Sequence, residues 1–196
     1  MRGAPALHST AVYTYPDNYQ LPISHYYTYL IDTGGKATIS GVIDAKHRGQ
    51  FAIWPSDKTT FNLGMKCVDV WLYVPVHNQS NKDICLIWQL ENAIDSARLY
   101  VESVNTIYAH PSASFFAPLA ERALPVKALF DTTWLSPGAK AGLYFHVFKN
   151  HYNTNIPMTL LPLDTFLQHE NLMNNIYTAY ISIFIFIILF NIFLLG

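Results

Sequence analysis

The feature that most constrains this chain is an apolar run near its C-terminal end. From Ile176 to Leu195 the sequence contains no charged residue and no proline. A helix of about 20 residues rises about 30 Å, which matches the hydrocarbon thickness of a bilayer. A buried helix of a soluble protein is the alternative, but such a run at a chain end would leave apolar surface exposed. The run therefore predicts a membrane-spanning helix.

Polar and aromatic residues qualify this prediction. Tyr177 and Tyr180 lie near the start of the run, where an interfacial aromatic belt would place them. Asn191 lies deep in the span, either as an amide bonded to a backbone carbonyl or as a contact for a partner helix. A single-span anchor usually continues into basic residues. Because the chain ends at Gly196, we expect it to be truncated after a first span.

The composition indicates a strand-rich domain before the span. The chain is 51% hydrophobic and 15% aromatic but only 13% charged. The thirteen tyrosines and twelve phenylalanines are too many for the span alone, and aromatic residues suit the pleated, half-buried surface of a sheet. A formal net charge of −1 without a Lys/Arg run argues against a nucleic-acid partner.

Short runs of strand character, separated by turn residues, fill the middle of the chain. Their number and spacing predict an all-β fold, an antiparallel β-sandwich, rather than βαβ units. No helical period appears before Thr165, where Asp164 or Thr165 can cap a helix that continues into the span. The expected strands are Phe51–Trp54, Val70–Val76, Ile84–Gln89, Ala97–Glu102, Leu124–Phe130, Leu143–Phe148 and Met158–Leu163.

These patterns divide the chain into four parts. Residues 1–20 are expected to be poorly ordered, and residues 21–165 to form the sandwich. Residues 166–175 are expected to form a juxtamembrane helix or linker, and residues 176–195 the transmembrane helix. The two cysteines, Cys67 and Cys85, match no metal or redox spacing. They are either a disulfide or two free thiols in neighbouring strands, and we favour the thiols.

The sequence offers little support for catalysis. Asp32-Thr33-Gly34 follows an apolar pair, as in the loop of aspartic proteases, but those enzymes need two such aspartates. The nearest second copy, at Asp131, lacks the glycine, so a surface turn is the favoured reading of the first. The eight histidines are scattered and show no metal-ligand spacing. We therefore expect no enzyme, no metal and no cofactor.

A binding domain is the remaining interpretation. Sugar rings stack on aromatic faces because their C–H surface is apolar, while their hydroxyls need hydrogen-bond partners. Arg122 is the best charged candidate for such a partner, with a solvated edge charge as its alternative. Core packing is the alternative for the aromatic candidates, which are Trp54, Trp71, Trp88, Trp134, Tyr73, Tyr100 and Tyr144.

The order of several short motifs resembles a known receptor family. The chain is similar to the periplasmic jelly-roll sensor domain of bacterial seven-transmembrane receptors with diverse intracellular signalling modules. The resemblance covers about residues 23–196. The motifs that carry it include Leu30-Ile31-Asp32-Thr33-Gly34-Gly35, Phe61-Asn62-Leu63-Gly64, Val70-Trp71-Leu72-Tyr73, Arg98-Leu99-Tyr100-Val101, Arg122-Ala123-Leu124-Pro125, Leu143-Tyr144-Phe145-His146-Val147 and Asn175-Ile176-Tyr177.

The resemblance implies a jelly-roll sensor of a carbohydrate or another small ligand. Its location would be the periplasmic side of a bacterial inner membrane. Its partners would be the ligand, the lipid bilayer, further transmembrane helices and a cytoplasmic signalling module. The alternative is a membrane-anchored structural or protein-interaction sandwich. The candidate ligand-binding residues are Arg122, Trp71, Tyr73, Trp88, Tyr100, Tyr144 and His146, the last standing where the family tends to have an arginine.

Overall fold

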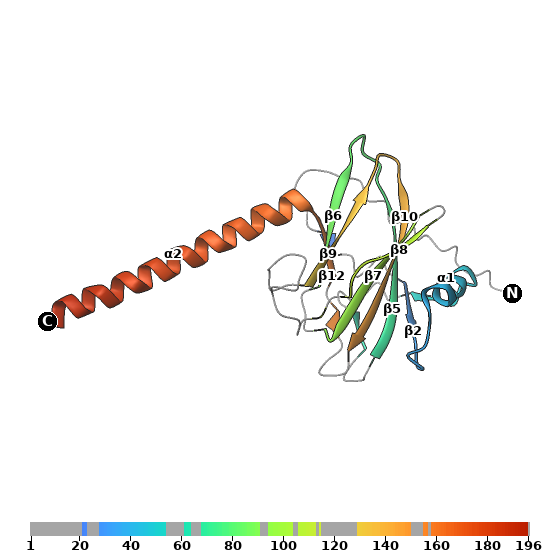
Figure 1. Ribbon diagram of the computed structural model, residues 1–196, viewed down its shortest axis with the longest axis horizontal. Helices are drawn as coiled ribbons and strands as arrows, with labels where there is room; N and C mark the ends of the chain where they lie inside the picture. The colour runs from blue at the N-terminus through green and yellow to red at the C-terminus, as the bar shows by residue number, and fades with distance from the viewer. Residues whose placement is uncertain are drawn as a thin grey trace.

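The computed structural model places most of the chain from residue 21 onward. The residues that it describes are 21–22, 28–53, 61–63, 68–90, 94–103, 106–112, 114, 129–149, 155–156 and 158–195. Residues 124–128 of the predicted strand Leu124–Phe130 and the expected N-terminal segment at 1–20 lie outside these residues. Two antiparallel sheets face one another, and a helix lies at each side of the sandwich (Figure 1).

The smaller of the two sheets has four strands. Their order across the sheet is β1-β12-β6-β9, with β1 at Leu21–Pro22, β12 at Met158–Pro162, β6 at Ile84–Leu90 and β9 at Leu129–Leu135. This four-stranded sheet carries the second helix, α2, which begins directly after β12.

The larger sheet has six strands in the order β3-β2-β5-β10-β7-β8. Their bounds are Ala52–Ile53 for β3, Thr28–Ile31 for β2, Val68–His77 for β5, Lys140–Lys149 for β10, Ser96–Glu102 for β7 and Ile107–Ala109 for β8. A separate two-stranded pair joins β4, Phe61–Asn62, to β11, Asn155–Ile156.

Eight of these strands follow a jelly-roll path. The pairs are nested: β1 pairs with β12, β5 with β10, β6 with β9, and β7 with β8, all antiparallel. The two members of each pair thus lie side by side in β1-β12-β6-β9 and in β5-β10-β7-β8, which is the double Greek-key arrangement of a jelly roll. The structure therefore confirms the predicted antiparallel, jelly-roll-like β-sandwich.

The side-chain alternation of β5 shows how the sandwich closes. Val70, Leu72 and Val74 point inward and are buried in the main core. They meet inward residues of the opposite sheet, such as Leu86 and Trp88 of β6. The period of two along each strand therefore divides it into a core face and an outer face, as the sequence predicts.

The first helix, α1, was not predicted. It spans Ile39–His47, although the sequence reading placed no helix before Thr165. Thr38 has extended backbone and its hydroxyl accepts a hydrogen bond from the Gly41 N–H, which is the geometry of an N-cap. The spacing of Ile39, Val42 and Ile43 was the signal that could have revealed it.

Several strand predictions also needed adjustment. β9 runs from Leu129 to Leu135, so the strand extends five residues past the predicted end at Phe130. Leu163 belongs to α2 and not to the last strand. Strands β2 and β8 were missed because each is short, at Thr28–Ile31 and Ile107–Ala109. Predicted ends of such elements commonly differ by a few residues.

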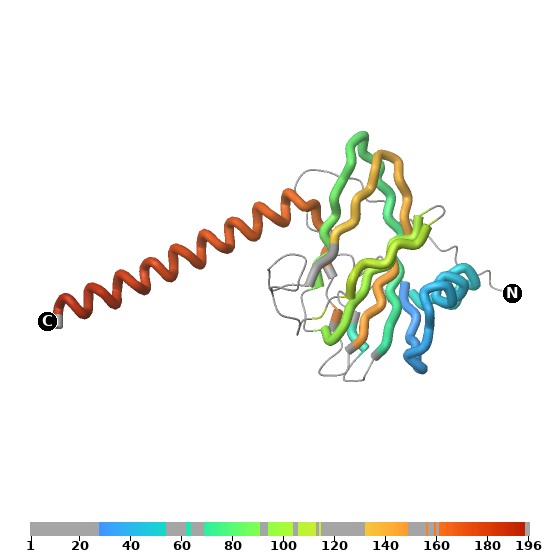
Figure 2. Tube along the Cα trace, viewed as in Figure 1, coloured from blue at the N-terminus to red at the C-terminus, as the bar shows by residue number. Residues whose placement is uncertain are grey.

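The second helix, α2, joins the sandwich to the apolar run without a break. It spans Leu163–Leu195, beginning two residues before the predicted Thr165, and leaves the domain on the side opposite α1 (Figure 2). Phe166 packs against Ile87 and Leu161 of the four-stranded sheet. Among the described residues α2 is the one helix long and apolar enough to cross a membrane, and its apolar stretch is not buried against the sandwich.

Polar side chains within the apolar run bond to the helix itself. The Asn191 amide Nδ2 donates to the Ile187 carbonyl at 2.7 Å. The Ser182 hydroxyl donates to the Thr178 carbonyl at 2.8 Å in the same i−4 pattern. Such bonds lower the cost of placing polar groups in hydrocarbon. The first of the two interpretations of Asn191 is therefore realised.

Candidate functional site

The outer face of the six-stranded sheet gathers most of the predicted binding residues. Strand register places Tyr73, Tyr144 and Tyr100 in one row across β5, β10 and β7. The next row contains Trp71, His146 and Arg98. Residues directly opposite in antiparallel pairs point to the same face, so both rows lie on this face. We call it the aromatic face and define it by these six residues.

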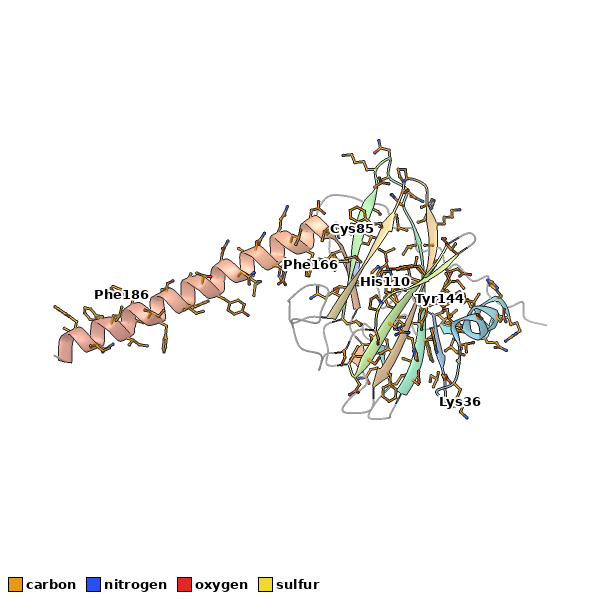
Figure 3. The ribbon with its side chains drawn as sticks, in the orientation of Figure 1. Lys36, Cys85, His110, Tyr144, Phe166 and Phe186 are labelled. Carbon is orange, nitrogen blue, oxygen red and sulfur yellow. The ribbon has the colours of Figure 1, made fainter. Side chains whose placement is uncertain are left out.

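Helix α1 covers part of the aromatic face. Val42, Ile43 and Ala45 of the helix pack with Phe51 onto Trp71 and Tyr144. Both of these aromatic residues are 1% exposed, and Tyr144 lies between its strand and α1 (Figure 3). Tyr73, Tyr100 and His146 remain only partly buried. Much of the aromatic surface therefore packs α1, and an open margin is left beside it.

Ring contacts make the cluster continuous. The Tyr73 and Tyr144 rings lie 4.8 Å apart, centroid to centroid, and Trp71 lies 5.5 Å from Tyr100. The Lys46 ammonium of α1 sits 4.5 Å from the centre of the Tyr73 ring, at cation–π distance. Burial lowers the pKa of Lys46. The last turn of α1 is thus held to the sheet by both apolar packing and charge.

Two ionisable contacts fix polar side chains on this face. The Tyr144 hydroxyl donates to the Glu102 carboxylate at 3.0 Å. Burial, and then the hydrogen bond to Glu102, raise the pKa of Tyr144 well above its ordinary value. The His146 Nε2 contacts the Asp69 carboxylate, while the imidazole stacks on Trp71 at 4.2 Å between ring centres. The two contacts orient Glu102 and His146, which are both only partly buried.

Three polar atoms on this side of the sheet have no hydrogen-bond partner within the described part of the chain. They are the indole Nε1 of Trp71, the guanidinium Nε of Arg98 and the hydroxyl Oγ1 of Thr28, all buried at the atom level. Thr28 lies opposite Tyr73 in the register of β2 and β5, so it shares the aromatic face. A buried polar group without a partner costs about 1–3 kcal/mol. These atoms form a set of two donors and one hydroxyl that a polar ligand could satisfy.

The predicted site residues therefore separate into groups. Trp71, Tyr73, Tyr100, Tyr144 and His146 meet on the aromatic face. Arg122, like Trp54, lies outside the described residues.

Two further tryptophans lie away from the aromatic face. Trp88 is buried in the sandwich core at 1% exposure, where its Nε1 donates to the Thr133 hydroxyl at 3.1 Å. We leave Trp88 out of the candidate site because it belongs to the four-stranded sheet and lies in the core between the sheets, away from the aromatic face. Trp134 lies on the four-stranded sheet instead and is exposed.

Sequence reasoning missed the charged residues of the aromatic face. Arg98 and Glu102 have the same parity along β7 as Tyr100, so alternation places all three on one side. Asp69 and Lys46 could not be found in this way, because His146 and Tyr73 approach them only through tertiary packing.

The protease-like motif has a structural role. The Asp32 carboxylate accepts hydrogen bonds from the Gly34 N–H at 3.1 Å and the Ala37 N–H at 2.7 Å. Burial opposes ionisation, but these backbone N–H groups dominate and lower the pKa of Asp32. Asp131 lies on β9 of the other sheet. In the described ranges no group of three or more His, Cys, Asp or Glu side chains is placed to hold a metal ion.

Comparison with known proteins assigns the domain to a family. Residues 24–162 match the family model described as 7TMR-DISM extracellular 2. No curated protein matches the chain. Among solved structures, a mutant of Xylanase10C from Cellvibrio japonicus in complex with xylopentaose aligns with a TM-score of 0.35 at 9% identity. The alignment covers 74% of this chain and 28% of the xylanase chain.

Proposed function

Because the chain belongs to the 7TMR-DISM extracellular 2 family, whose members are extracellular domains of seven-transmembrane receptors, we propose that it is the ligand-sensing part of a membrane signalling receptor. The ligand is a carbohydrate or another small polar molecule. The domain faces the periplasm of a bacterial inner membrane. Further transmembrane helices and a cytoplasmic signalling module complete the receptor.

Three polar atoms of the aromatic face, which have no hydrogen-bond partner among the residues that the structure describes, carry this proposal. Trp71 Nε1, Arg98 Nε and Thr28 Oγ1 lie buried on one side of a sheet, among aromatic rings and beside the His146–Asp69 contact. A ligand with several hydroxyl groups offers both the acceptors and the donors that these atoms need. Aromatic edges at the margin add apolar contact to the ligand rings. The proposed direct contacts are therefore Tyr73, Tyr100, His146 and Arg98, which are only partly buried. Trp71 contributes through its indole Nε1, and Tyr144 orients the Glu102 carboxylate.

The continuity of β12 and α2 supports transmission to the membrane. β12 ends at Pro162 and α2 begins at Leu163, so one rigid helix runs from the sheet into the apolar run. Phe166 anchors the first turn of that helix to the sandwich. A ligand shifts the arrangement of domain and helix only if its affinity differs between the two arrangements. The helix then conveys the shift to the rest of the receptor.

Binding measurements on the full chain test this function. The chain is held in polyoxyethylene detergent, screened on a glycan array, and followed by thermal unfolding with each hit. We expect a hit to raise the melting temperature of the wild type. Arg98→Gln should weaken its binding about tenfold, because a donor to the ligand is lost. Arg48→Gln, which changes an exposed arginine at the end of α1, is the matched control.

The outcome that contradicts the sensor function is a chain stabilised by a protein partner and by no small molecule. A specific observation favours that structural or protein-interaction alternative. Trp71 and Tyr144 are nearly inaccessible beneath α1, so their rings act first as packing. If Arg98→Gln and Arg48→Gln bind a hit equally well, the ligand does not occupy the aromatic face.

A further inference from the structure

A pocket of about 620 Å³ lies on the far side of the sandwich from the aromatic face, where α2 leaves the four-stranded sheet. We call it the junction pocket. Its walls come from the loop between β5 and β6, from the neighbouring strands β6 and β9, and from the first turns of α2. The volume falls in the range of small-molecule sites. Cys85 lies in this region beside the base of α2, which carries the labelled Phe166 (Figure 3).

An open tryptophan forms the apolar part of the junction pocket. Trp134 is 69% exposed and stands directly opposite Cys85 in the register of β9 and β6. Leu163 and Leu167 of α2 add apolar side chains to the same lining. Tryptophan buries much of its surface in most folded domains, so an indole left this open beside a cavity offers a stacking platform.

Polar side chains surround this platform. Asp83 and Asp164 bring carboxylates from the β5–β6 loop and from the start of α2, and Lys82 and Asn81 bring donors. Sugar hydroxyls both donate and accept hydrogen bonds, so a rim with both kinds of group suits them. The two carboxylates outnumber the one ammonium, so the lining carries a net negative charge that disfavours an anionic ligand. The chemistry therefore fits a neutral ring with hydroxyl groups.

The loop that forms one wall is already held in place. The buried Asn78 amide donates to the Lys82 carbonyl at 2.8 Å and to the Leu135 carbonyl at 2.9 Å. Its oxygen accepts from the Ser80 N–H at 2.9 Å and from the Ser80 hydroxyl at 2.7 Å. Asn78 thereby ties the loop to the end of β9. A preformed wall reduces the ordering that a ligand must induce.

We propose that the junction pocket binds a neutral sugar ring, stacked on Trp134, that contacts the β5–β6 loop and the first turn of α2 together. This second site is separate from the aromatic face. Because one wall is the helix that continues into the apolar run, an occupied pocket strengthens the attachment of α2 to the sandwich. The two sites therefore act on different ends of the same domain, and either can bind without the other.

Saturation-transfer NMR on the full chain in polyoxyethylene detergent tests the ligand class. A detergent with sugar headgroups would compete for the pocket and is avoided. The probes are D-glucose, N-acetyl-D-glucosamine and cellobiose, with D-glucuronate as the anionic counterpart. We expect at least one neutral probe to bind with millimolar affinity and glucuronate to bind more weakly. The proposal is overturned if saturation passes from the protein to no neutral probe, or if glucuronate binds equally well.

Variants locate the bound sugar. Trp134→Ala should lower the affinity for the neutral probe at least about tenfold, because the stacking surface is lost. Trp134→Phe should retain part of the affinity, since an aromatic face remains. Both Trp134 variants are also measured in the Arg98→Gln background, so that sugar bound at the aromatic face does not contribute to the difference. Arg48→Gln, which changes an exposed arginine at the end of α1, should leave this binding unchanged. Unchanged binding of the probe after Trp134→Ala in the Arg98→Gln background contradicts the junction pocket as the site.

Hydrogen exchange tests the effect on the helix. With the bound probe we expect slower amide exchange at residues 164–167 in the wild type, and no such slowing in Trp134→Ala. Residues 107–109 of the distant strand β8 serve as the internal control. If a bound sugar leaves exchange at residues 164–167 unchanged, the coupling of the pocket to α2 is wrong even though the pocket binds.

Discussion

The two outer faces of the sandwich both carry a tryptophan, but the side chain is buried on one face and exposed on the other. On the six-stranded sheet, Trp71 is 1% exposed beneath α1 and belongs to a continuous aromatic cluster. On the four-stranded sheet, Trp134 is 69% exposed beside the base of α2. One helix lies flat on its sheet, while the other touches its sheet only at the first turns and then departs. The manner of helix packing therefore decides whether an aromatic residue stabilises the fold or stays available to a ligand.

The largest expected effect separates the two tryptophans directly. Trp71→Ala should lower the free energy of unfolding by about 3–5 kcal/mol, because a large buried side chain is replaced by a cavity. Trp134→Ala should change it by no more than about 0.5 kcal/mol, as is usual for exposed positions. Urea unfolding of both variants in detergent measures the difference. Similar losses in the two variants would break the contrast between the faces.

The buried amide behind the junction pocket gives the next effect. Asn78→Ala should cost about 3 kcal/mol of unfolding free energy, because it leaves buried carbonyl and N–H partners unsatisfied. Its exposed neighbour supplies the control, since Gln79→Ala should stay within about 0.5 kcal/mol. The same urea titration reports both variants. A mild effect at Asn78 would mean that the loop does not depend on this side chain for its shape.

Gly142 lies on the aromatic face, where a larger residue would test how closely the side chains pack. A Cβ added at Gly142 would lie 2.9 Å from Tyr73 Cε2 and 3.0 Å from the Glu102 carboxylate. Gly142→Ala should therefore displace both side chains and cost about 2 kcal/mol. Gly41→Ala, in α1, meets only ordinary contacts and should raise the unfolding free energy by about 0.5 kcal/mol. Thermal unfolding of the two variants should shift in opposite directions.

The smallest effect concerns the ionisation of the aromatic face. Burial, and then the Glu102 hydrogen bond, raise the pKa of Tyr144, so the folded chain holds this proton more tightly than the unfolded chain. The resulting stability is present in full below about pH 10 and is lost as the pH rises further. Tyr144→Phe should flatten that alkaline loss and cost about 1 kcal/mol at neutral pH. Tyr108→Phe, at an exposed ring, should reproduce the wild-type profile, and an unflattened profile for Tyr144→Phe would refute the assignment.

Much of the sandwich could be predicted because its strands alternate strictly. Along β5, one set of residues alternates with another, which identifies both the strand and its two faces. The core set is Val70, Leu72 and Val74, and the outer set is Trp71 and Tyr73. The short helix α1 was not predicted because only three of its nine residues, Val42, Ile43 and Ala45, are buried. The position of Trp88 in the core between the sheets could not be read from the sequence for a related reason. Alternation shows that a residue lies on a face, but it does not show whether that face is covered.

The sequence by itself determined the apolar run, the strand faces and the all-β class, because these depend on periods of two and on unbroken hydrophobicity. Only the tertiary structure decided which aromatic residues are covered. It also placed the charged partners Asp69 and Lys46 beside His146 and Tyr73. The junction pocket likewise joins Lys82, Trp134 and Leu167, which are far apart along the chain. Side-chain period is a local property, whereas covering a face and closing a pocket require elements that meet only when the jelly roll is complete.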